Sequence, residues 1–143
     1  MEWFNTVSNL VTHNTETVIS STNSIRGKFI DTYTFEQRYN ETYRIRQSYP
    51  DRVPIICEKS LNQDLPNIDK NKYLVPVDLT VGQFLFVIKR RIKLRHEEAL
   101  YLFINGTIPP TSELIGTTYE KHKNNDGFLY ITYAKENTFG FDN

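Results

Sequence analysis

The chain has 143 residues, of which 38% are hydrophobic, and its 17 Lys and Arg residues balance its 17 Asp and Glu residues. This length is typical of one domain that buries a core without disulfides or a structural metal, and the composition argues against a disordered chain. The net charge of zero argues against a general nucleic-acid binder, because such proteins neutralise phosphates with an excess of basic residues.

Residues 1–24 are predicted to form a flexible N-terminal extension. Hydrophobic residues recur at helical spacing within residues 2–11, which favours a short amphipathic helix there. Residues 12–24 are mostly polar, with many Ser, Thr and Asn, and they offer too little hydrophobic surface to offset the entropy of ordering. We therefore interpret residues 12–24 as a linker to the folded region.

The next elements are predicted from hydrophobic spacing and from residues that end helices. A helix over residues 35–49 presents one face made of Phe35, Tyr39, Thr42 and Ile45, and Pro50 ends it. Thr80 and Gln83 have the spacing of an N-terminal capping box. In chain order the pattern then predicts strands at residues 53–58 and 73–77, a helix from 81 through Ile92, a strand at 99–104, a turn at Asn105–Gly106, a short helix at 112–122 and a strand at 128–134.

This order of elements predicts an α+β fold for residues 25–134. Four strands would form one mixed sheet around the one long helix, because packing a sheet on a helix buries the hydrophobic face of each. The arrangement is the ubiquitin-like β-grasp, with additional helices at its N-terminal side.

Five segments closely resemble the GABARAP-type autophagy modifiers. They are Tyr49–Pro54, Asp69–Pro76, Asp78–Phe84, Ile108–Thr111 and Gly127–Tyr133. The resemblance runs from about Lys28 to Gly140 in the family's order and spacing, but the N-terminal extension is longer and Tyr33–Thr34 replaces a common His-Pro. It implies the same fold and a role in autophagosome formation, protein transport and recruitment of cargo receptors, without catalytic residues or a metal.

The polar residues after the last strand predict a flexible tail over residues 135–143. The resemblance implies that a dedicated cysteine protease cleaves the Gly140–Phe141 bond and removes the propeptide Phe141, Asp142 and Asn143. Activating and conjugating enzymes of the autophagy pathway would then join Gly140 to phosphatidylethanolamine, which is a covalent lipid and not a cofactor. Glycine suits these steps because a residue without a Cβ can enter a narrow protease channel.

Lipid attachment determines where the protein is expected in the cell. Two acyl chains hold a protein on a membrane more stably than one. The lipidated form is expected on autophagosome membranes and cytoplasmic vesicles and in the vacuole or lysosome, and the free form in the cytoplasm. Cys57 is the single cysteine, no segment approaches the roughly 20 hydrophobic residues of a membrane span, and Met1–Phe4 lacks signal-peptide features, so export is not expected.

The resemblance also implies a groove that binds peptides of the pattern aromatic-x-x-aliphatic, found in cargo receptors. An extended peptide can add as a further strand to the edge of the strand at residues 72–76. The peptide's aromatic residue would enter a pocket lined by Glu41, Ile45, Pro54, Ile56, Lys72, Leu74 and Phe128, and its aliphatic residue a pocket lined by Tyr73, Val75, Pro76, Leu79, Phe84 and Val87. Acidic peptide residues should be attracted to Arg52, Lys70 and Lys72, and Arg91 completes the predicted set.

Other interpretations remain open. Phe4 and Val7 themselves match the aromatic-x-x-aliphatic pattern, so the extension is a ligand of its own or a neighbour's groove, a membrane-contacting helix or an inert tail. The chain could also be a non-conjugated trafficking adaptor that uses the groove with its tail intact. A hydrolase based on Cys57 has little support, because a cysteine in a hydrophobic strand is usually a buried thiol. The three His residues lack zinc-like spacing.

Overall fold

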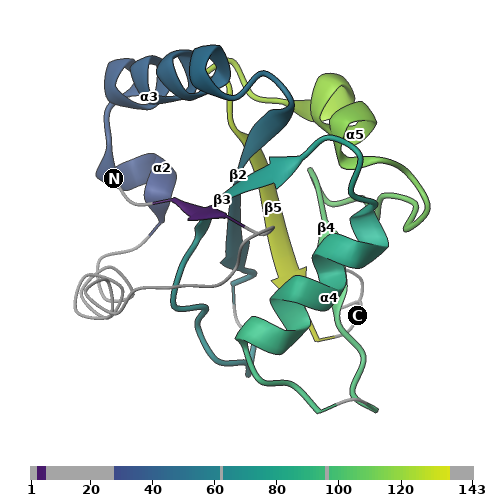
Figure 1. Cartoon of the computed structure of the whole chain (residues 1–143). Coiled ribbons are helices and arrows are strands. Elements are labelled where there is room, and N and C mark those ends of the chain that lie inside the picture. The colour runs from purple at the N-terminus through teal and green to yellow at the C-terminus, as the bar shows by residue number, and fades with distance from the viewer. Residues whose placement is uncertain (1–2, 6–27, 62, 96, 136–143) are drawn as a thin grey trace.

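The computed structural model describes residues 3–5, 28–61, 63–95 and 97–135. Its centre is a mixed sheet with the strand order β1-β3-β2-β5-β4 (Figure 1). In that order the strands are Phe4–Asn5, Lys72–Pro76, Arg52–Lys59, Leu129–Ala134 and Tyr101–Phe103. The central strands β2 and β5 are parallel, and β3 and β4 flank them in antiparallel pairs. Strands β2 to β5 confirm the predicted four-stranded β-grasp, and β1 adds a fifth strand from the N-terminal extension.

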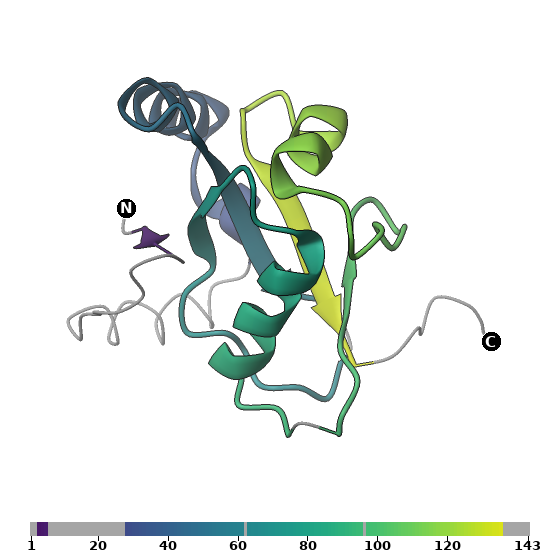
Figure 2. The same cartoon turned by 45° about the vertical axis from the view of Figure 1, so that its right-hand side comes forward.

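One face of the sheet is covered by α4 (Val81–Arg91) and α5 (Ile115–His122), and Figure 2 shows α4 in front of the strands. The predicted capping box of α4 is present. Thr80 Oγ1 accepts a hydrogen bond from the backbone N–H of Gln83, and the Gln83 side chain accepts one from the N–H of Thr80. Phe84 of α4 is fully buried in the main core. This core fixes the position of β3, whose edge carries the predicted groove.

The helix predicted at residues 112–122 begins only at Ile115, because the preceding segment serves α4 instead. The backbone carbonyls of Thr111 and Glu113 accept hydrogen bonds of 2.9 Å from the N–H groups of Gly82 and Val81. N–H groups in the first turn of a helix have no partner within that helix. The segment before Ile115 is therefore held as a cap for α4.

The opposite face carries α2 (Phe29–Thr32), behind the sheet in Figure 2, and α3 (Phe35–Ser48). A second capping box, between Thr34 and Gln37, begins α3. Both helices precede β2 in the chain and confirm the predicted N-terminal helices. α3 ends before Pro50, as the sequence predicts.

The inward face of α3 differs from the prediction. Arg38, Thr42 and Ile45 are buried, whereas Phe35 and Tyr39 remain 50% and 45% exposed. Arg38 can be buried because a buried carboxylate forms an ion pair with it. A pattern of hydrophobic residues cannot anticipate such a partner, which lies far away in the sequence.

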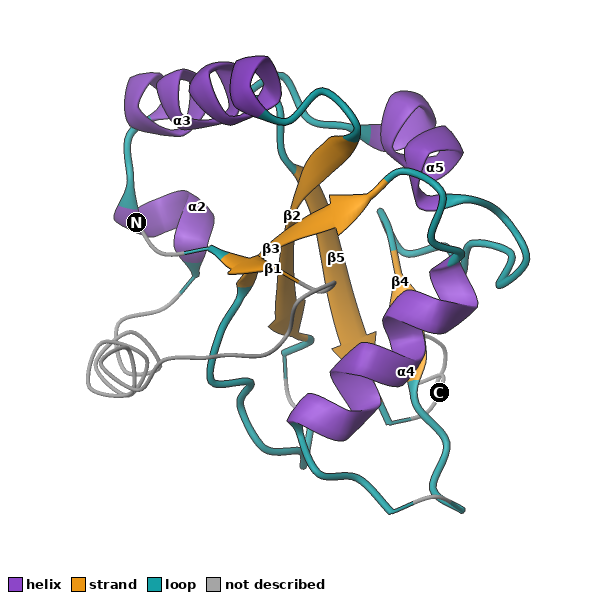
Figure 3. Cartoon of the chain, in the orientation of Figure 1, coloured by secondary structure: helices purple, strands orange, loops and turns teal. Residues whose placement is uncertain are grey.

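The helix predicted over residues 2–11 is wrong where the structure describes that segment. Residues 4–5 form β1, which pairs in parallel with β3 at the edge of the sheet (Figure 3). The edge of a strand offers backbone groups that an added strand can pair with, whereas an isolated helix of this length is marginal in water. Residues 6–11 and the predicted linker at 12–24 lie outside the described residues.

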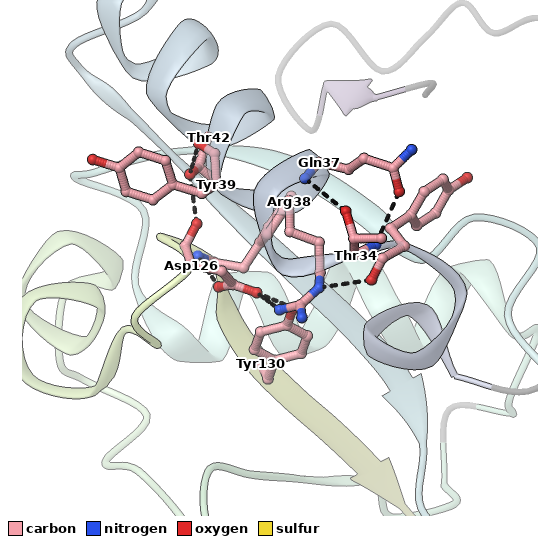
Figure 4. Close-up of polar contacts among 9 residues, drawn as sticks. Thr34, Gln37, Arg38, Tyr39, Thr42, Asp126 and Tyr130 are labelled. Atoms are coloured by element: carbon pink, nitrogen blue, oxygen red, sulfur yellow. Dashed lines mark hydrogen bonds and ion pairs between the residues drawn. The ribbon is translucent and has the colours of Figure 1, made fainter.

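A buried polar cluster fixes α3 against the start of β5 (Figure 4). The Asp126 carboxylate has no exposed area, and it pairs with Arg38 and accepts hydrogen bonds from the Tyr130 hydroxyl and the backbone N–H of Phe128. The Thr42 hydroxyl donates a hydrogen bond of 2.6 Å to the Asp126 carbonyl. We call Arg38, Thr42, Asp126 and Tyr130 the Asp126 cluster.

Burial and the charges within the cluster shift the pKa values of Tyr130 and Arg38. Burial, and then the Asp126 carboxylate, raise the pKa of the Tyr130 hydroxyl, so this group stays a proton donor. Burial acts to lower the pKa of Arg38, but the contacts with Asp126 and Tyr130 outweigh it and raise that pKa. The cluster therefore joins a positive guanidinium to a carboxylate that also accepts hydrogen bonds from the Tyr130 hydroxyl and the Phe128 N–H.

The residue next to Asp126 must be glycine for this packing. Gly127 has a φ of +92°, and a Cβ at this position would lie 2.2 Å from Thr42 Oγ1. A side chain would therefore push α3 away from β5. The close approach places Phe128, the following residue, with its ring fully buried on the face that carries α2.

Replacing Asp126 by alanine should destabilise the fold by about 3 to 5 kcal/mol, because the change leaves the Arg38 guanidinium buried without its partner. Urea unfolding followed by circular dichroism measures the loss.

Glu120→Ala is the matched control for that experiment. Glu120 also pairs with a basic residue, Lys123, at 2.7 Å, but both side chains are exposed. Its removal should change the free energy of unfolding by no more than about 0.5 kcal/mol. A loss below about 1 kcal/mol for Asp126→Ala would contradict the role given to the Asp126 cluster.

Candidate functional site

Four of the predicted pocket residues meet where α3, β2, β3 and the start of β5 come together. They are Glu41, Ile56, Lys72 and Phe128, which we call the aromatic site. Ile56 and Lys72 are direct partners in the β2–β3 register, and Ile56 and Phe128 belong to one buried hydrophobic cluster. The Asp126 cluster orients α3 and the start of β5 relative to each other, since it joins α3 to the backbone of Phe128.

The indole of Trp3 occupies the aromatic site. Its ring stacks on Phe128 with a centroid distance of 5.8 Å and an angle of 20° between the planes. The Lys72 Nζ lies 4.2 Å from the indole centroid, within the range of a cation–π contact. The indole N–H donates a hydrogen bond to the Glu41 carboxylate. The site therefore recognises both the face and the N–H of an aromatic residue.

Two opposite charges within the aromatic site hold each other in place. Lys72 Nζ lies 3.3 Å from Glu41 Oε2, and only 3% of the Lys72 side chain is exposed. Burial acts to raise the pKa of Glu41, but the Trp3 hydrogen bond and the charges of Lys72 and Arg44 outweigh it, and the pKa falls below 4.5. A buried lysine is tolerated when it is paired, as Lys72 is here.

The backbone after Trp3 adds to the sheet as a strand. Phe4 aligns with Tyr73 and Asn5 with Leu74, in parallel. The predicted edge for peptides is therefore occupied by the chain's own N-terminus. The open alternative based on the aromatic-x-x-aliphatic pattern has Phe4 as the anchor of such a contact, but the residue in the aromatic site is Trp3.

The other predicted aromatic-pocket residues lie nearby, and additional aromatic residues surround them. Ile45, Pro54 and Leu74 are buried. Phe29 of α2 packs edge-on against Phe128 at 5.1 Å, and Tyr33 and Tyr130 border the same cluster. The prediction missed these three aromatic residues. The four-residue helix that carries Phe29 is too short for a periodic signal, so nothing in the local sequence pointed to it.

The six residues predicted for the aliphatic pocket divide into two groups. Tyr73, Val75 and Phe84 have no exposed area and belong to the main core. Pro76, Leu79 and Val87 are partly exposed. In this conformation a ligand can contact the second group only, and the first group supports it from below.

The predicted basic residues lie along the same region but differ in their surroundings. Arg91 forms an ion pair of 2.6 Å with Asp69. The Arg52 guanidinium lies 5.9 Å from the Tyr49 ring centroid, and Lys70 is partly exposed. A ligand carboxylate near Arg91 would have to compete with Asp69.

A nucleophilic cysteine and a metal site have no support in the described part of the chain. Cys57 is fully buried, and burial, followed by the charge of Glu58, raises the pKa of its thiol well above the ordinary value. In residues 3–5, 28–61, 63–95 and 97–135, the structure contains neither a group of residues suited to a metal nor a helix able to cross a membrane. Gly140 and the propeptide lie outside the described residues.

Comparison with known proteins relates the chain to autophagy proteins. A family model described as "Autophagy protein Atg8 ubiquitin like" matches residues 37–140. Autophagy-related protein 8 of Lodderomyces elongisporus is 58% identical over 119 residues, covering 83% of this chain and 82% of the relative. The proteins of the same name from Candida albicans and Schizosaccharomyces pombe are 59% and 58% identical over 116 residues, covering 81% of this chain and 86% and 96% of the relatives.

Solved structures extend the similarity to the fold. Trypanosoma brucei ATG8 superimposes with a TM-score of 0.74 at 46% identity, covering 80% of this chain and 98% of that structure. A structure of Plasmodium falciparum Atg8 in complex with a Plasmodium falciparum Atg3 peptide gives a TM-score of 0.72 at 37% identity, covering 77% and 97%. These similarities confirm the ubiquitin-like fold.

Acid should remove Trp3 from the aromatic site before the fold is lost. The folded-state pKa of Glu41 is lowered. The contribution of its carboxylate to holding Trp3 is therefore complete above pH 4.5 and disappears as the pH falls through that lowered pKa. Trp3 is the only tryptophan, so its emission during an acid titration should shift to longer wavelength below pH 4.5.

Glu41→Gln provides the control, since glutamine keeps a hydrogen-bond acceptor but does not titrate. Its Trp3 emission should show no separate step in acid while circular dichroism still reports a folded chain. An identical step in the variant would show that another group is responsible.

Proposed function

Because the chain belongs to the Atg8 family of ubiquitin-like autophagy proteins, which are modifiers and not enzymes, we propose that it is cleaved after Gly140 and conjugated to phosphatidylethanolamine. The observation that supports this most directly is that the family match ends at residue 140, a glycine, and that Phe141, Asp142 and Asn143 follow it. A precursor of this kind has a short propeptide directly after the residue that becomes the new C-terminus.

The proposed chemistry uses partner enzymes and needs no catalytic group in this chain. Hydrolysis of the Gly140–Phe141 bond by a cysteine protease releases the tripeptide and exposes the Gly140 carboxylate. The carboxylate attacks ATP to form an acyl adenylate and releases pyrophosphate, and an enzyme thiol then displaces AMP to give a thioester. The amine of phosphatidylethanolamine then attacks the thioester carbonyl, the thiol leaves, and an amide bond forms.

The attached lipid would determine where the protein acts. Each buried methylene contributes about 0.8 kcal/mol to membrane binding, and two chains give stable anchoring where one is marginal. We assign the conjugated form to autophagosome membranes, cytoplasmic vesicles and the vacuole or lysosome, and the unconjugated form to the cytoplasm. The other candidate is a non-conjugated trafficking adaptor that keeps its tail and uses the same groove.

Conjugation should depend on Gly140 and not on the identity of the propeptide. With the family's protease, activating and conjugating enzymes, ATP and phosphatidylethanolamine liposomes, the full chain should gain the mass of the lipid and lose residues 141–143. Gly140→Ala should yield about tenfold less conjugate or none, because a side chain obstructs the protease channel and thioester attack.

Asn143→Ala serves as the control, since cleavage removes that residue and the lipidated product is unchanged. Intact mass spectrometry of membranes from cells tests the same proposal without added enzymes. Chains on those membranes that retain residues 141–143 and carry no lipid would favour the trafficking adaptor.

The second part of the proposal is that the groove binds aromatic-x-x-aliphatic peptides of cargo receptors and conjugation enzymes. Two features support it: the edge of β3 pairs with an added strand, and the aromatic site holds an indole. The relative from Plasmodium falciparum was solved with an Atg3 peptide. Strand addition supplies affinity through the backbone, and side-chain pockets supply specificity.

Peptide affinity in the micromolar range is expected. An aromatic anchor buries about 150 to 250 Å², which at about 25 cal/mol per Å² gives roughly 4 to 6 kcal/mol before the costs of ordering. Acidic residues before the anchor would be attracted to Arg52, Lys70 and Lys72, with Arg91 as a further contact. Lipidated copies on one membrane would raise the avidity of receptors that carry several motifs.

Leu79→Ala should weaken peptide binding by about 1 to 2 kcal/mol, because Leu79 is a partly exposed member of the predicted aliphatic pocket. A calorimetric double-mutant cycle isolates the contact: replacing the peptide's aliphatic residue by alanine should cost less in the Leu79→Ala chain than in the parent.

Leu61→Ala is the matched control, because Leu61 is 73% exposed and lies outside the predicted groove. Its effect on peptide affinity should be negligible. Additive losses in the cycle would mean that Leu79 and the aliphatic residue of the peptide do not touch.

A further inference from the structure

We propose that the chain's own N-terminus is an intramolecular ligand of the aromatic site, anchored by Trp3, and that it competes with receptor peptides. This inference rests on the proposed peptide-binding function. Competition is expected because Trp3 contacts predicted ligand-binding residues and β1 pairs with the strand edge that a peptide would use.

The contacts of Trp3 are those of a specific ligand. The indole stacks on Phe128, covers the Lys72 ammonium and donates its N–H to Glu41. Stacking, a cation on the ring face and a hydrogen bond to a carboxylate thus act on one side chain. Phenylalanine could not make the last contact, since it lacks an N–H.

The direction of β1 matches that of a receptor peptide in the proposed groove. With Phe4 beside Tyr73 and Asn5 beside Leu74, the strand leaves the aromatic site and runs towards Pro76. Pro76 belongs to the predicted aliphatic pocket. An incoming peptide with its aromatic anchor at Phe128 and its aliphatic residue near Pro76 would therefore need the same stretch of β3.

Both ends of the intervening segment reach the same aromatic ring. The ring centroid of Trp3 lies 5.8 Å from that of Phe128. The ring centroid of Phe29, just after the segment 6–27, lies 5.1 Å from that of Phe128. The backbone N–H of Phe29 is fixed by a hydrogen bond of 2.9 Å to Glu58. Residues 6–27 therefore connect two points that are close in space, and a single chain satisfies the contact without a second copy.

The sequence makes this ligand incomplete. The residue three positions after Trp3 is Thr6, where the aromatic-x-x-aliphatic pattern requires Leu, Ile or Val. Phe4 is followed at that spacing by Val7, but the residue whose ring occupies the aromatic site is Trp3. To use Phe4 as the anchor, β1 would have to shift by one residue along β3, and such a shift turns every side chain of a strand to the other face of the sheet. A receptor peptide with both anchors should therefore displace the N-terminus.

Tethering determines how strongly the internal ligand competes. Covalent connection within one chain gives an effective concentration on the order of 1 mM, and a ligand with one anchor is expected to have an intrinsic Kd of about 0.1 to 0.5 mM. The apparent affinity of a receptor peptide is then reduced by about three- to tenfold. The site would be occupied most of the time yet remain accessible to complete ligands.

The test measures binding of a fluorescein-labelled acidic peptide that contains Phe-x-x-Ile and no tryptophan. Fluorescence anisotropy is recorded with the parent chain, Trp3→Ala and the matched control Phe4→Ala, which keeps the indole. Trp3→Ala should bind about three- to tenfold more tightly than the parent, and Phe4→Ala should bind like the parent. Equal affinity of the parent and Trp3→Ala would overturn the proposal, as would tighter binding for Phe4→Ala alone.

Trp3 emission gives a second readout in the unmodified chain. Excitation at 295 nm reports only the indole, so adding unlabelled peptide should shift its emission to longer wavelength as Trp3 enters water. Emission that is constant from about 1 to 100 μM protein supports the intramolecular contact. A concentration-dependent emission with a dimer in sedimentation velocity would overturn it in favour of a second copy.

The outcomes separate this inference from the proposed function. If the peptide binds none of the three chains, both the peptide groove and the competition are overturned. If it binds all three equally and does not move the Trp3 emission, the groove stands and the internal ligand is overturned.

Discussion

The buried carboxylate of Asp126 is the contact on which the candidate site depends. It joins Arg38 of α3 to Tyr130 of β5 and receives the backbone N–H of Phe128. One group therefore sets the distance between α3, which carries Glu41, and Phe128. A buried ion pair adds little net stability compared with hydrophobic packing, but its loss is costly, because either partner alone stays charged and buried. α3 is thus restricted to one position over the sheet.

The aromatic site repeats this use of buried charge nearer the surface. Lys72 and Glu41 pair beneath the indole, and the carboxylate also accepts the indole N–H. Low solvent exposure strengthens each of these electrostatic contacts. The arrangement favours a ligand that presents a flat ring with a donor at its edge, so it distinguishes tryptophan from phenylalanine through a polar contact in an otherwise hydrophobic setting.

Local signals predicted much of the fold, and distant partners account for the errors. The capping box at Thr80 and Gln83 and the helix end at Pro50 depend on a few adjacent residues, and both appear in the structure. Burial of Arg38 depends on Asp126, 88 positions away, and no hydrophobic pattern contains that information. The strand at residues 4–5 likewise exists because β3 offers an edge, which a periodicity within residues 2–11 cannot reveal.

The proposed internal ligand also bears on which receptors the lipidated protein selects. A receptor must displace Trp3 at every site it occupies, so its affinity for each site is reduced by about three- to tenfold. A peptide with one motif shows this reduction in full. A receptor with several motifs gains about 10²- to 10⁴-fold from effective concentration after its first contact, which exceeds the cost of the next. Copies gathered on one membrane would therefore bind multivalent receptors in preference to single motifs. Because the internal ligand has the polar Thr6 where the pattern requires an aliphatic residue, it binds weakly enough for such receptors to displace it.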